Sequence, residues 1–491
     1  MKIGIDFGTS FSLPAGMIND MPLTLLPNGE YGIPTVFYYD EDVGVLIGSA
    51  AEDNADFQPL NVKRDIKMEI STGTDAFTAD GRTFSKKQII GYIFREIAHV
   101  AKQESVRREL VSQGIDGVVI SVPAAFTLRE LNFIREAAQM PESEGGAGMN
   151  VLGFIREPVA AAIAYFNAPN AEDEKTILVY DLGGGTCDVA IVRSSKVSDE
   201  WYKVIDSDMK RIGGRDWDRI LIDMIKCKLR EKAQDLDFDP EIESKIRERA
   251  IRAKHILSNQ PTAKVSVMVR GKTYSCVISV EEFEAATAGV LRSTMDMVEA
   301  LMKKQGNKVD YIVCVGGSSN MPQIRKAFEK NYPGITVKLF EPEKAIAFGA
   351  AIYAEHLKEP KYLKDICKFS YGARYVEDYN KYKDKNRLRI FNIIYKGSQL
   401  PASSSFRSSR IEDGCSDIYI AVYESECTDN MYLPENGTYI GDIRITGIVD
   451  GKKDDETRLT INIDQSGLMS LEAVEQKTGK TAEVEIQLKD F

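Results

Sequence analysis

Two short segments of the sequence combine aspartate, glycine and threonine in a way that suits phosphate chemistry. "DFGTS" covers residues 6–10 and "DLGGGTCD" covers residues 181–188, and each follows an apolar run typical of a β-strand. Glycine lets the backbone approach a phosphate and present its N–H groups, and a carboxylate at a strand end can hold a hydrated Mg²⁺. The hydroxyls of Thr9 and Thr186 are suited to hydrogen-bond phosphate or an attacking water. We therefore expect two turns that grip a nucleotide's phosphates from both sides of a cleft.

Two further glycine pairs occur in similar positions along the chain. They are Gly213-Gly214 in "RIGGRDWD" and Gly316-Gly317 in "VGGSS". A single glycine-rich turn is more often a hairpin than a phosphate site. Four such turns in one α/β chain, two of them carrying Asp and Thr, favour a nucleotide site closed around phosphate and sugar.

The length and composition of the chain set the frame for this site. A chain of 491 residues is too long for one compact core and predicts two to four structural units. Its apolar content of 43% and charged content of 28% are those of an ordinary soluble globular protein. The net charge of −11 gives no general attraction to nucleic acid or to an anionic membrane, so we expect neither as a partner.

The cysteines indicate the cellular compartment. The chain has seven cysteines, with no CxxC pair, and most lie inside apolar runs, as buried reduced thiols of a cytosolic protein do. A strand begins at Lys2, with no secretory apolar segment before it, and no apolar run approaches about 20 residues. We expect a cytoplasmic protein.

The elements that must position the glycine turns alternate between strand and helix up to about residue 357, which is typical of α/β layers. Ser85 is a candidate helix cap, and capping-box spacing recurs at Thr127 with Glu130 and at Ser279 with Glu282. Buried strands are predicted at "GVVISVPAAF", "KTILVYD" and "YIVCVGG".

The pattern changes after this region. Residues 358–366 read as a short polar linker, and residues 367–491 alternate at period two between turn residues. We expect a separate β-sandwich there, with a hairpin turn at Asp464 to Gly467.

The order and spacing of the motifs resemble one known family, the seventy-kilodalton heat-shock chaperones, which are the DnaK-like branch of the actin and sugar-kinase ATPases. The segments that carry the resemblance are "IGIDFGTSFS", "VVISVPAAF", "REPVAAAIAYF", "VYDLGGGTCDVAIV", "IGGRDWD", "RAKHILS", "VCVGGSSNMPQI" and "EPEKAIAFGAA". It is strong over residues 1–357 and weaker in the β region. It implies an α/β protein: a two-lobed, actin-like ATPase domain with a duplicated α/β fold (residues 1–357), the linker, and a β-sandwich that binds substrate or partner (residues 367–491).

The resemblance also implies a set of site residues and cofactors. The cofactors are ATP or ADP with Mg²⁺, with K⁺ as a further ion. Lys63 matches a catalytic lysine that orients the attacking water, and Glu157 matches a carboxylate that positions water and cation; taken alone, they would be a solvated charge and a helix-start acid. The implied catalytic residues are Lys63, Glu157, Asp181 and Thr186. The implied metal ligands are Asp6, Asp181 and Asp188. The implied nucleotide-binding residues are Gly8, Thr9, Ser10, Gly183, Gly184, Gly185, Gly213, Gly214, Lys254, His255, Ser258, Gly316, Gly317 and Ser318.

The sequence departs from the family's pattern in the nucleoside pocket and the linker. His255 and Asn320 stand where the family has arginines, and Ile251 replaces a ribose-binding glutamate. We therefore expect ATP to bind with altered affinity. In the linker, Tyr362-Leu363-Lys364 keeps one of the family's leucines, which weakens the expected coupling between domains.

The β region departs further. A longer, highly charged loop, residues 373–386, replaces the family's short apolar arch over the peptide groove. The chain stops at Phe491, so we expect no helical lid, either because the sequence is truncated or because this is an atypical, lidless relative.

These observations favour an ATPase and ATP-dependent molecular chaperone, with a role in the stress response, that couples hydrolysis to polypeptide binding. The alternative is a nucleotide-dependent interaction protein that binds one specific partner. A third reading, a small-molecule kinase of the same superfold, gives the β region no role. The partners implied are unfolded polypeptide or a specific protein client, a J-protein and a nucleotide-exchange factor, and we expect a monomer.

Overall fold

The computed structural model describes residues 1–55, 57–72, 76–108, 114–195, 197, 200–233, 236–269, 271–306, 308–359, 361–377, 387–414 and 416–485. Contacts divide the chain into two compact units. The first consists of residues 1–124, 134–196 and 207–358, and the second of residues 125–133, 197–206 and 359–491. Within the described ranges, every helix is too short or too polar to cross a membrane.

The first sheet begins with a hairpin and is extended by parallel strands. Its order is β11-β10-β1-β2-β3, with β4 also paired to β2. The pair β1–β2 is antiparallel, whereas β1–β10 and β10–β11 are parallel. The strands are β1 (Lys2–Phe7), β2 (Phe11–Ile18), β3 (Met21–Thr24), β4 (Ile33–Pro34), β10 (Gly117–Val122) and β11 (Val151–Arg156).

A second sheet repeats this topology. The order β18-β17-β12-β13-β14 has an antiparallel hairpin, β12–β13, followed on its other side by the parallel pairs β12–β17 and β17–β18. The predicted duplicated α/β fold is thereby confirmed. The strands are β12 (Thr176–Leu182), β13 (Cys187–Ser194), β14 (Tyr202–Lys210), β17 (Tyr311–Val315) and β18 (Thr336–Leu339).

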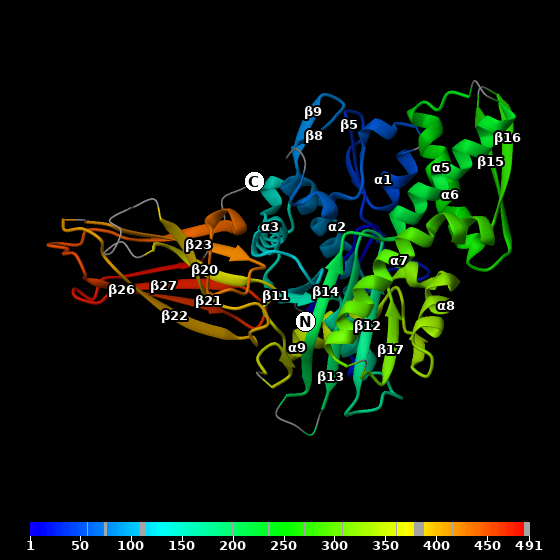
Figure 1. Ribbon diagram of the computed structural model, residues 1–491. Helices are drawn as coiled ribbons and strands as arrows, with labels where there is room; N and C mark the ends of the chain where they lie inside the picture. The colour runs from blue at the N-terminus through cyan, green and yellow to red at the C-terminus, as the bar shows by residue number, and fades with distance from the viewer. Residues whose placement is uncertain are drawn as a thin grey trace. The chain divides into compact units, whose positions relative to one another are not determined.

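Helices follow the strands in the same order in both halves (Figure 1). Helices α4 and α9, which come after the last strand of each sheet, pack so closely that a methyl group added at Gly349 would lie 1.8 Å from the carbonyl oxygen of Ala160. Every residue of α4 is buried, which explains its almost wholly apolar sequence. The helices are α2 (Lys86–Arg107), α3 (Leu128–Gln139), α4 (Glu157–Phe166), α7 (Val280–Lys304), α8 (Pro322–Asn331) and α9 (Ala345–His356).

The predicted helix starts are confirmed. The Ser85 hydroxyl accepts from the Gln88 N–H and begins α2, and Ser279 forms a reciprocal capping box with Glu282 at the start of α7. Thr127 and Glu130 exchange the same bonds before α3.

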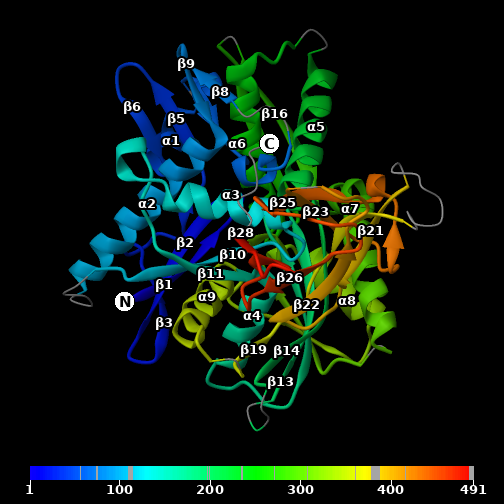
Figure 2. The same cartoon turned by 90° about the vertical axis from the view of Figure 1, so that its left-hand side faces the viewer.

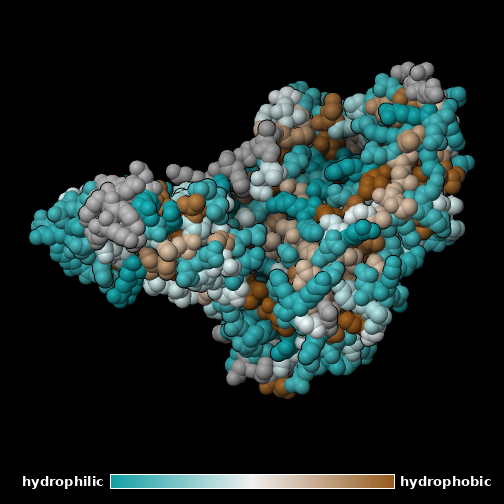
Figure 3. Space-filling model, viewed as in Figure 1, coloured by the Kyte–Doolittle hydropathy of each residue, from teal (hydrophilic) through white to brown (hydrophobic). Residues whose placement is uncertain are grey.

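Two smaller parts complete the first unit. Beside the first sheet lie β5 (Phe37–Asp40), β6 (Gly44–Ile47), α1 (Ser49–Asn54), β7 (Val62–Lys63), β8 (Ala76–Ala79) and β9 (Arg82–Ser85). Beside the second lie α5 (Gly214–Lys232), α6 (Pro240–Leu257), β15 (Thr262–Val269) and β16 (Lys272–Ser279). The space-filling view is hollowed between the α1 part and the α5–α6 part, and its surface is mostly hydrophilic there (Figure 3). Short 3₁₀ turns at η1 (Pro59–Asn61), η2 (Ile66–Glu69), η3 (Glu142–Glu144) and η4 (Gly317–Asn320) connect the elements.

The predicted linker contains a short strand, β19 (Leu363–Lys364), which pairs in parallel with Tyr202 and Lys203 inside the second unit. Tyr362 and Leu363 are buried, and the Tyr362 ring meets that of Tyr202 edge to face at 5.2 Å. The polar composition of this segment did not indicate that Tyr362 would be buried.

The part of the second unit that begins at β20 is the predicted β-sandwich (Figure 2). One sheet has the order β24-β21-β20-β23-β25 and the other β22-β26-β27-β28. The strands are β20 (Ser370–Val376), β21 (Leu388–Ile394), β22 (Ala402–Ser409), β23 (Ile418–Ser425), β24 (Met431–Tyr432), β25 (Thr438–Ile445), β26 (Glu456–Ile463), β27 (Met469–Glu475) and β28 (Thr481–Glu485), with a 3₁₀ turn η5 (Pro434–Asn436).

Side chains from both sheets, including Val422, Ile443, Leu459 and Leu471, form its core. The hairpin turn at Asp464 to Gly467 joins β26 to β27 as predicted.

The structure describes part of the predicted charged loop and six of the seven cysteines. Residues 373–376 belong to strand β20 rather than to a loop, and Glu377 pairs with Arg387 and Arg389. Residues 378–386 lie outside the described residues. The six cysteines of the described ranges are not in disulfide bonds, and the seventh, Cys415, lies outside those ranges.

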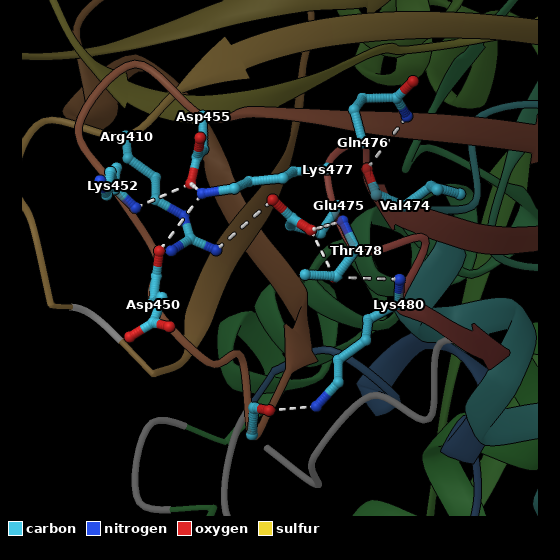
Figure 4. Close-up of polar contacts among 11 residues, drawn as sticks. Arg410, Asp450, Lys452, Asp455, Val474, Glu475, Gln476, Lys477, Thr478 and Lys480 are labelled. Carbon is cyan, nitrogen blue, oxygen red and sulfur yellow. Dashed lines mark hydrogen bonds and ion pairs between the residues drawn. The ribbon is translucent and has the colours of Figure 1, made fainter.

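A buried ion pair lies at one end of the sandwich (Figure 4). Arg410 follows β22, and its guanidinium lies 3.9 Å from the carboxylate of Glu475 at the end of β27; their side chains are 6% and 0% exposed. The other Glu475 oxygen accepts bonds from the backbone N–H and the hydroxyl of Thr478, at 2.6 and 2.5 Å. No sequence pattern had singled out this pair.

Candidate nucleotide site

The two Asp-Gly-Thr turns lie against each other inside the first unit. Residues 8–10 connect β1 to β2, and residues 183–186 connect β12 to β13. A methyl group added at Gly184 would lie 2.3 Å from Ser10 Oγ, and one added at Gly185 would lie 2.8 Å from Thr9 Oγ1. Larger residues at these two glycines would collide with the opposite turn, so glycine is needed for the close approach.

The third and fourth glycine segments join the same place. The backbone N–H of Gly214 donates to the carbonyl of Gly183 at 2.9 Å, at the start of α5. The Ser318 hydroxyl donates to the same carbonyl at 3.0 Å. Gly316 has a φ of +80°, and a methyl group there would lie 2.4 Å from Asp181 Oδ1. The four segments that sequence patterns singled out separately are thus brought together.

Three buried carboxylates lie at the base of these turns. Oxygen atoms of Glu157, Asp181 and Asp188 all lie within 4.8 Å of one another. Asp181 is the second-last residue of β12 and Asp188 the second residue of β13, opposite each other in the antiparallel register, while Glu157 is the first residue of α4. The strand pairing and the helix start therefore create the cluster.

Asp6 lies outside that group of three, although the family resemblance implied it among the metal ligands. Its Oδ1 accepts a hydrogen bond from Ser121 at 3.1 Å. Burial, and then the charge of Glu157, raise the pKa of Asp6 to about 7, against the opposing effects of Lys67 and Ser121. Asp6 therefore belongs electrostatically to the cluster.

The cluster fits a divalent cation. Among the described residues, Asp181 Oδ1 and Asp188 Oδ2 are buried without a hydrogen-bond partner. Burial and the neighbouring Glu157 raise the pKa of Asp188 to about 7 and that of Asp181 well above its usual range. Several buried carboxylates disfavour one another's charge unless a cation offsets it, and oxygen ligands are those that Mg²⁺ prefers. These residues could hold Mg²⁺.

The threonines and the two lysines of this region differ in their surroundings. Thr9 and Thr186 are both buried, and the Thr186 hydroxyl bonds Asp188. The Lys63 ammonium is bound by both oxygens of Glu69, at 2.6 and 2.8 Å. Glu157 is bound instead by Lys67, at 2.5 Å.

The residues expected at the nucleoside lie on α6 and at its end. Lys254 forms an ion pair with Asp218 of α5 at 2.7 Å, and a methyl group at Gly214 would lie 3.3 Å from its ammonium. The Ser258 hydroxyl donates to the Lys254 carbonyl at 3.1 Å. His255 is exposed on α6, and its contact with a nucleotide base remains a prediction. Lys254 is therefore the α6 residue that contacts the glycine segments directly.

Sequence reasoning missed Lys67 and Asp218. Lys67 had one local signal, its position between the apolar residues Ile66 and Met68 in "DIKME", which predicts a buried stem. Asp218 had a weaker one, its place one turn after the glycine pair in "GGRDWD".

Comparisons with known proteins agree with the fold. The family model described as "Hsp70 protein" matches residues 71–490. A ribosome-associated molecular chaperone of Eremothecium gossypii is 26% identical over 532 residues, covering 99% of this chain and 81% of that protein. A ribosome-associated molecular chaperone of Saccharomyces cerevisiae is 27% identical, with the same coverage. With a match across most of its length and the duplicated ATPase topology followed by a β-sandwich, the chain belongs to the Hsp70 family.

Proposed function

We propose that this protein is an ATP-dependent molecular chaperone that hydrolyses ATP in its first unit and binds polypeptide through its β-sandwich. The observation that carries the proposal is the meeting of four glycine segments with three buried carboxylates, two of which have buried oxygens with no hydrogen-bond partner within the described part of the chain. Members of the Hsp70 family are ATPases, and the relatives in yeast-like fungi are named as ribosome-associated chaperones.

Residues at different positions in the site would have different roles in binding and hydrolysis. The backbone N–H groups of residues 8–10 and 183–185 would bind the phosphates from both sides. Asp181, Asp188 and Glu157 would hold Mg²⁺, which when bound would neutralise charge on the phosphates. Thr9 and Thr186 would orient phosphate or water. Catalysis would then consist of positioning and electrostatic stabilisation, as phosphoryl transfer generally requires.

The second unit would supply the polypeptide site. We propose unfolded or nascent polypeptide as the client, because the relatives are named as ribosome-associated chaperones. A J-protein and a nucleotide-exchange factor as partners, a cytoplasmic location, K⁺ as a second ion and a monomeric state remain predictions from the sequence.

Steady-state ATP hydrolysis, measured with and without a panel of extended apolar peptides, tests this function. We expect Mg²⁺-dependent turnover that the peptides stimulate and that Asp181→Asn abolishes. The exposed α5 residue Asp223 provides a control with the same change of charge, and Asp223→Asn should leave turnover unchanged.

Other results would point elsewhere. Tight ATP binding without any response to peptides would contradict the chaperone proposal in favour of a protein that recognises one specific partner. ATP consumption that requires a sugar would indicate a kinase.

A further inference from the structure

The site contains a lysine that the family resemblance did not single out. Lys67 lies in the 3₁₀ turn η2, its side chain is 2% exposed, and its ammonium is bound to Glu157 at 2.5 Å. The same ammonium lies 5.8 Å from the centre of the Phe7 ring, at the end of β1. Glu157 is one of the three clustered carboxylates, so the charge of Lys67 lies at the edge of the cluster.

The turn that carries Lys67 lies against the second phosphate-binding turn at Gly185, where the first turn also approaches through Thr9. A methyl group added at Gly185 would lie 2.7 Å from Met68 Sδ and 2.8 Å from Thr9 Oγ1. Asp65, just before η2, has a φ of +57°, a conformation that L-residues rarely adopt outside turns. The chain therefore bends sharply after Arg64 and directs residues 66–68 into the interior, where all three are buried.

Lys63, four residues earlier, contacts other residues than Lys67 does. Its side chain is 20% exposed and is bound by Glu69, whose own side chain is 38% exposed. Its ammonium lies 5.9 Å from the centre of the Phe77 ring on β8. The Lys63 charge is thus neutralised by a partly solvated carboxylate.

Resting on the ATPase function proposed above, we propose that Lys67, in place of Lys63, supplies the ammonium that acts on the terminal phosphate of the nucleotide. A lysine ammonium is a compact charge with three rotatable donors, so it can hold Glu157 and turn toward a phosphate oxygen or the attacking water. Its buried position strengthens its attraction to a developing negative charge. The Glu157 carboxylate fixes the ammonium in place.

The decisive experiment compares Lys67→Met with Lys63→Met in the full chain. Single-turnover ATP hydrolysis gives the rate, and calorimetry gives the affinities for Mg²⁺-ATP and Mg²⁺-ADP. We expect Lys67→Met to lower the rate on the order of 100-fold. It should also reduce the preference for ATP over ADP by about 10-fold. Lys63→Met should change neither quantity by more than about 3-fold.

A second variant is needed as a control for misfolding, because Lys67→Met leaves the buried Glu157 without its cation. The double variant Lys67→Met/Glu157→Gln removes both charges of the pair with little change of volume. We expect the double variant to lose more of the preference for ATP over ADP than Glu157→Gln alone, because only the double variant lacks the ammonium. If the double variant keeps the wild-type ratio of affinities, Lys67 is only the counter-ion of Glu157, and the inference is wrong.

The two proposals fail in different ways. If the unsubstituted protein binds neither nucleotide, the ATPase proposal fails, and the role of Lys67 fails with it. If the unsubstituted protein binds and hydrolyses ATP but Lys63→Met abolishes the rate while Lys67→Met does not, only the inference about Lys67 is overturned.

Discussion

Two buried ion pairs, one in each unit, each join a basic side chain to a glutamate but have different surroundings. Lys67–Glu157 lies beside the carboxylates of the nucleotide site, and Arg410–Glu475 lies at the end of the sandwich. Each joins one basic and one acidic side chain with little solvent exposure. In both cases the acid lies at an element boundary, at the start of α4 or the end of β27.

The difference is in how the negative charge is satisfied. Burial alone would raise the pKa of Glu475, but hydrogen bonds from the Thr478 hydroxyl and backbone N–H lower it. In the nucleotide site, burial and neighbouring acids raise the pKa of Asp6 and Asp188 to about 7, and the charge of Lys67 offsets this only in part.

This contrast distinguishes an ion pair inside the sandwich from one beside the proposed cation site. Thr478 satisfies one Glu475 oxygen. The other oxygen has no hydrogen-bond partner among the described residues, but the Arg410 guanidinium lies 3.9 Å from it, so the pair balances its own charge without a ligand and can serve stability alone. The carboxylates around Glu157 exceed the local positive charge, and the Mg²⁺ of the proposed site would supply the missing charge. An excess of buried like charge is therefore the better indicator of function.

The largest effect on stability is expected from Arg410→Met. It leaves Glu475 buried without its cation, and breaking a buried pair in this way costs about 3–5 kcal/mol. Hydrogen exchange, followed by mass spectrometry on peptides from β26 and β27, measures the loss. Arg407→Met is the matched control on β22, because Arg407 is 66% exposed and pairs with an exposed Glu456. Equal losses in the two variants would contradict a role for burial.

Asp181→Asn should weaken nucleotide binding and yet stabilise the nucleotide-free protein. It removes a carboxylate of the cation site, so we expect Mg²⁺-ATP affinity to fall on the order of 100-fold, or about 3 kcal/mol. Without nucleotide, the first unit should become more stable, because one uncompensated buried charge is gone. Calorimetric titration and a thermal melt measure the two changes. A variant that loses affinity and stability together would show that the cluster is structural.

Glu475→Gln sharpens the comparison through pH. Because the folded-state pKa of Glu475 is lowered, its charge stabilises the protein above the ordinary value of about 4.3, and this contribution is lost as the pH falls through the folded-state pKa. We expect the variant to be less stable by about 2 kcal/mol at pH 7. Hydrogen exchange of β27 at several pH values should show the difference between variant and wild type shrinking in acid. A difference independent of pH would exclude a contribution from the charge.

The smallest effect is expected from Ser279→Ala, which removes the cap of α7 in the first unit. Loss of such a cap costs about 1 kcal/mol. Since the cap touches none of the glycine segments, Mg²⁺-ATP affinity should be unchanged while the melting temperature falls. A drop in affinity here would mean that general destabilisation can mimic the effect of Asp181→Asn, and would weaken the comparison.

Much of this protein followed from local sequence pattern. The glycine turns, the capping boxes at Ser85 and Ser279 and the change from helical to alternating period each depend on residues within a few positions of one another. Such signals survive folding because backbone geometry and capping are short-range effects. They were enough to predict the α/β layers, the sandwich and the glycine segments of the site, whereas the duplication of the α/β fold was implied by the family resemblance.

The tertiary structure decided which charges meet. Lys63 and Lys67 lie four residues apart in one polar segment, and nothing in their spacing shows which of them reaches Glu157, 90 residues away. The bend at Asp65 and the burial of η2 bring Lys67, rather than Lys63, to Glu157. In the same way, the pairing of Arg410 with Glu475 depends on β22 and β27, which flank β26 in one sheet and end at the same edge of it. Local pattern therefore determined where the turns and caps lie, whereas packing between distant segments determined which buried charges are satisfied and which still need a cation.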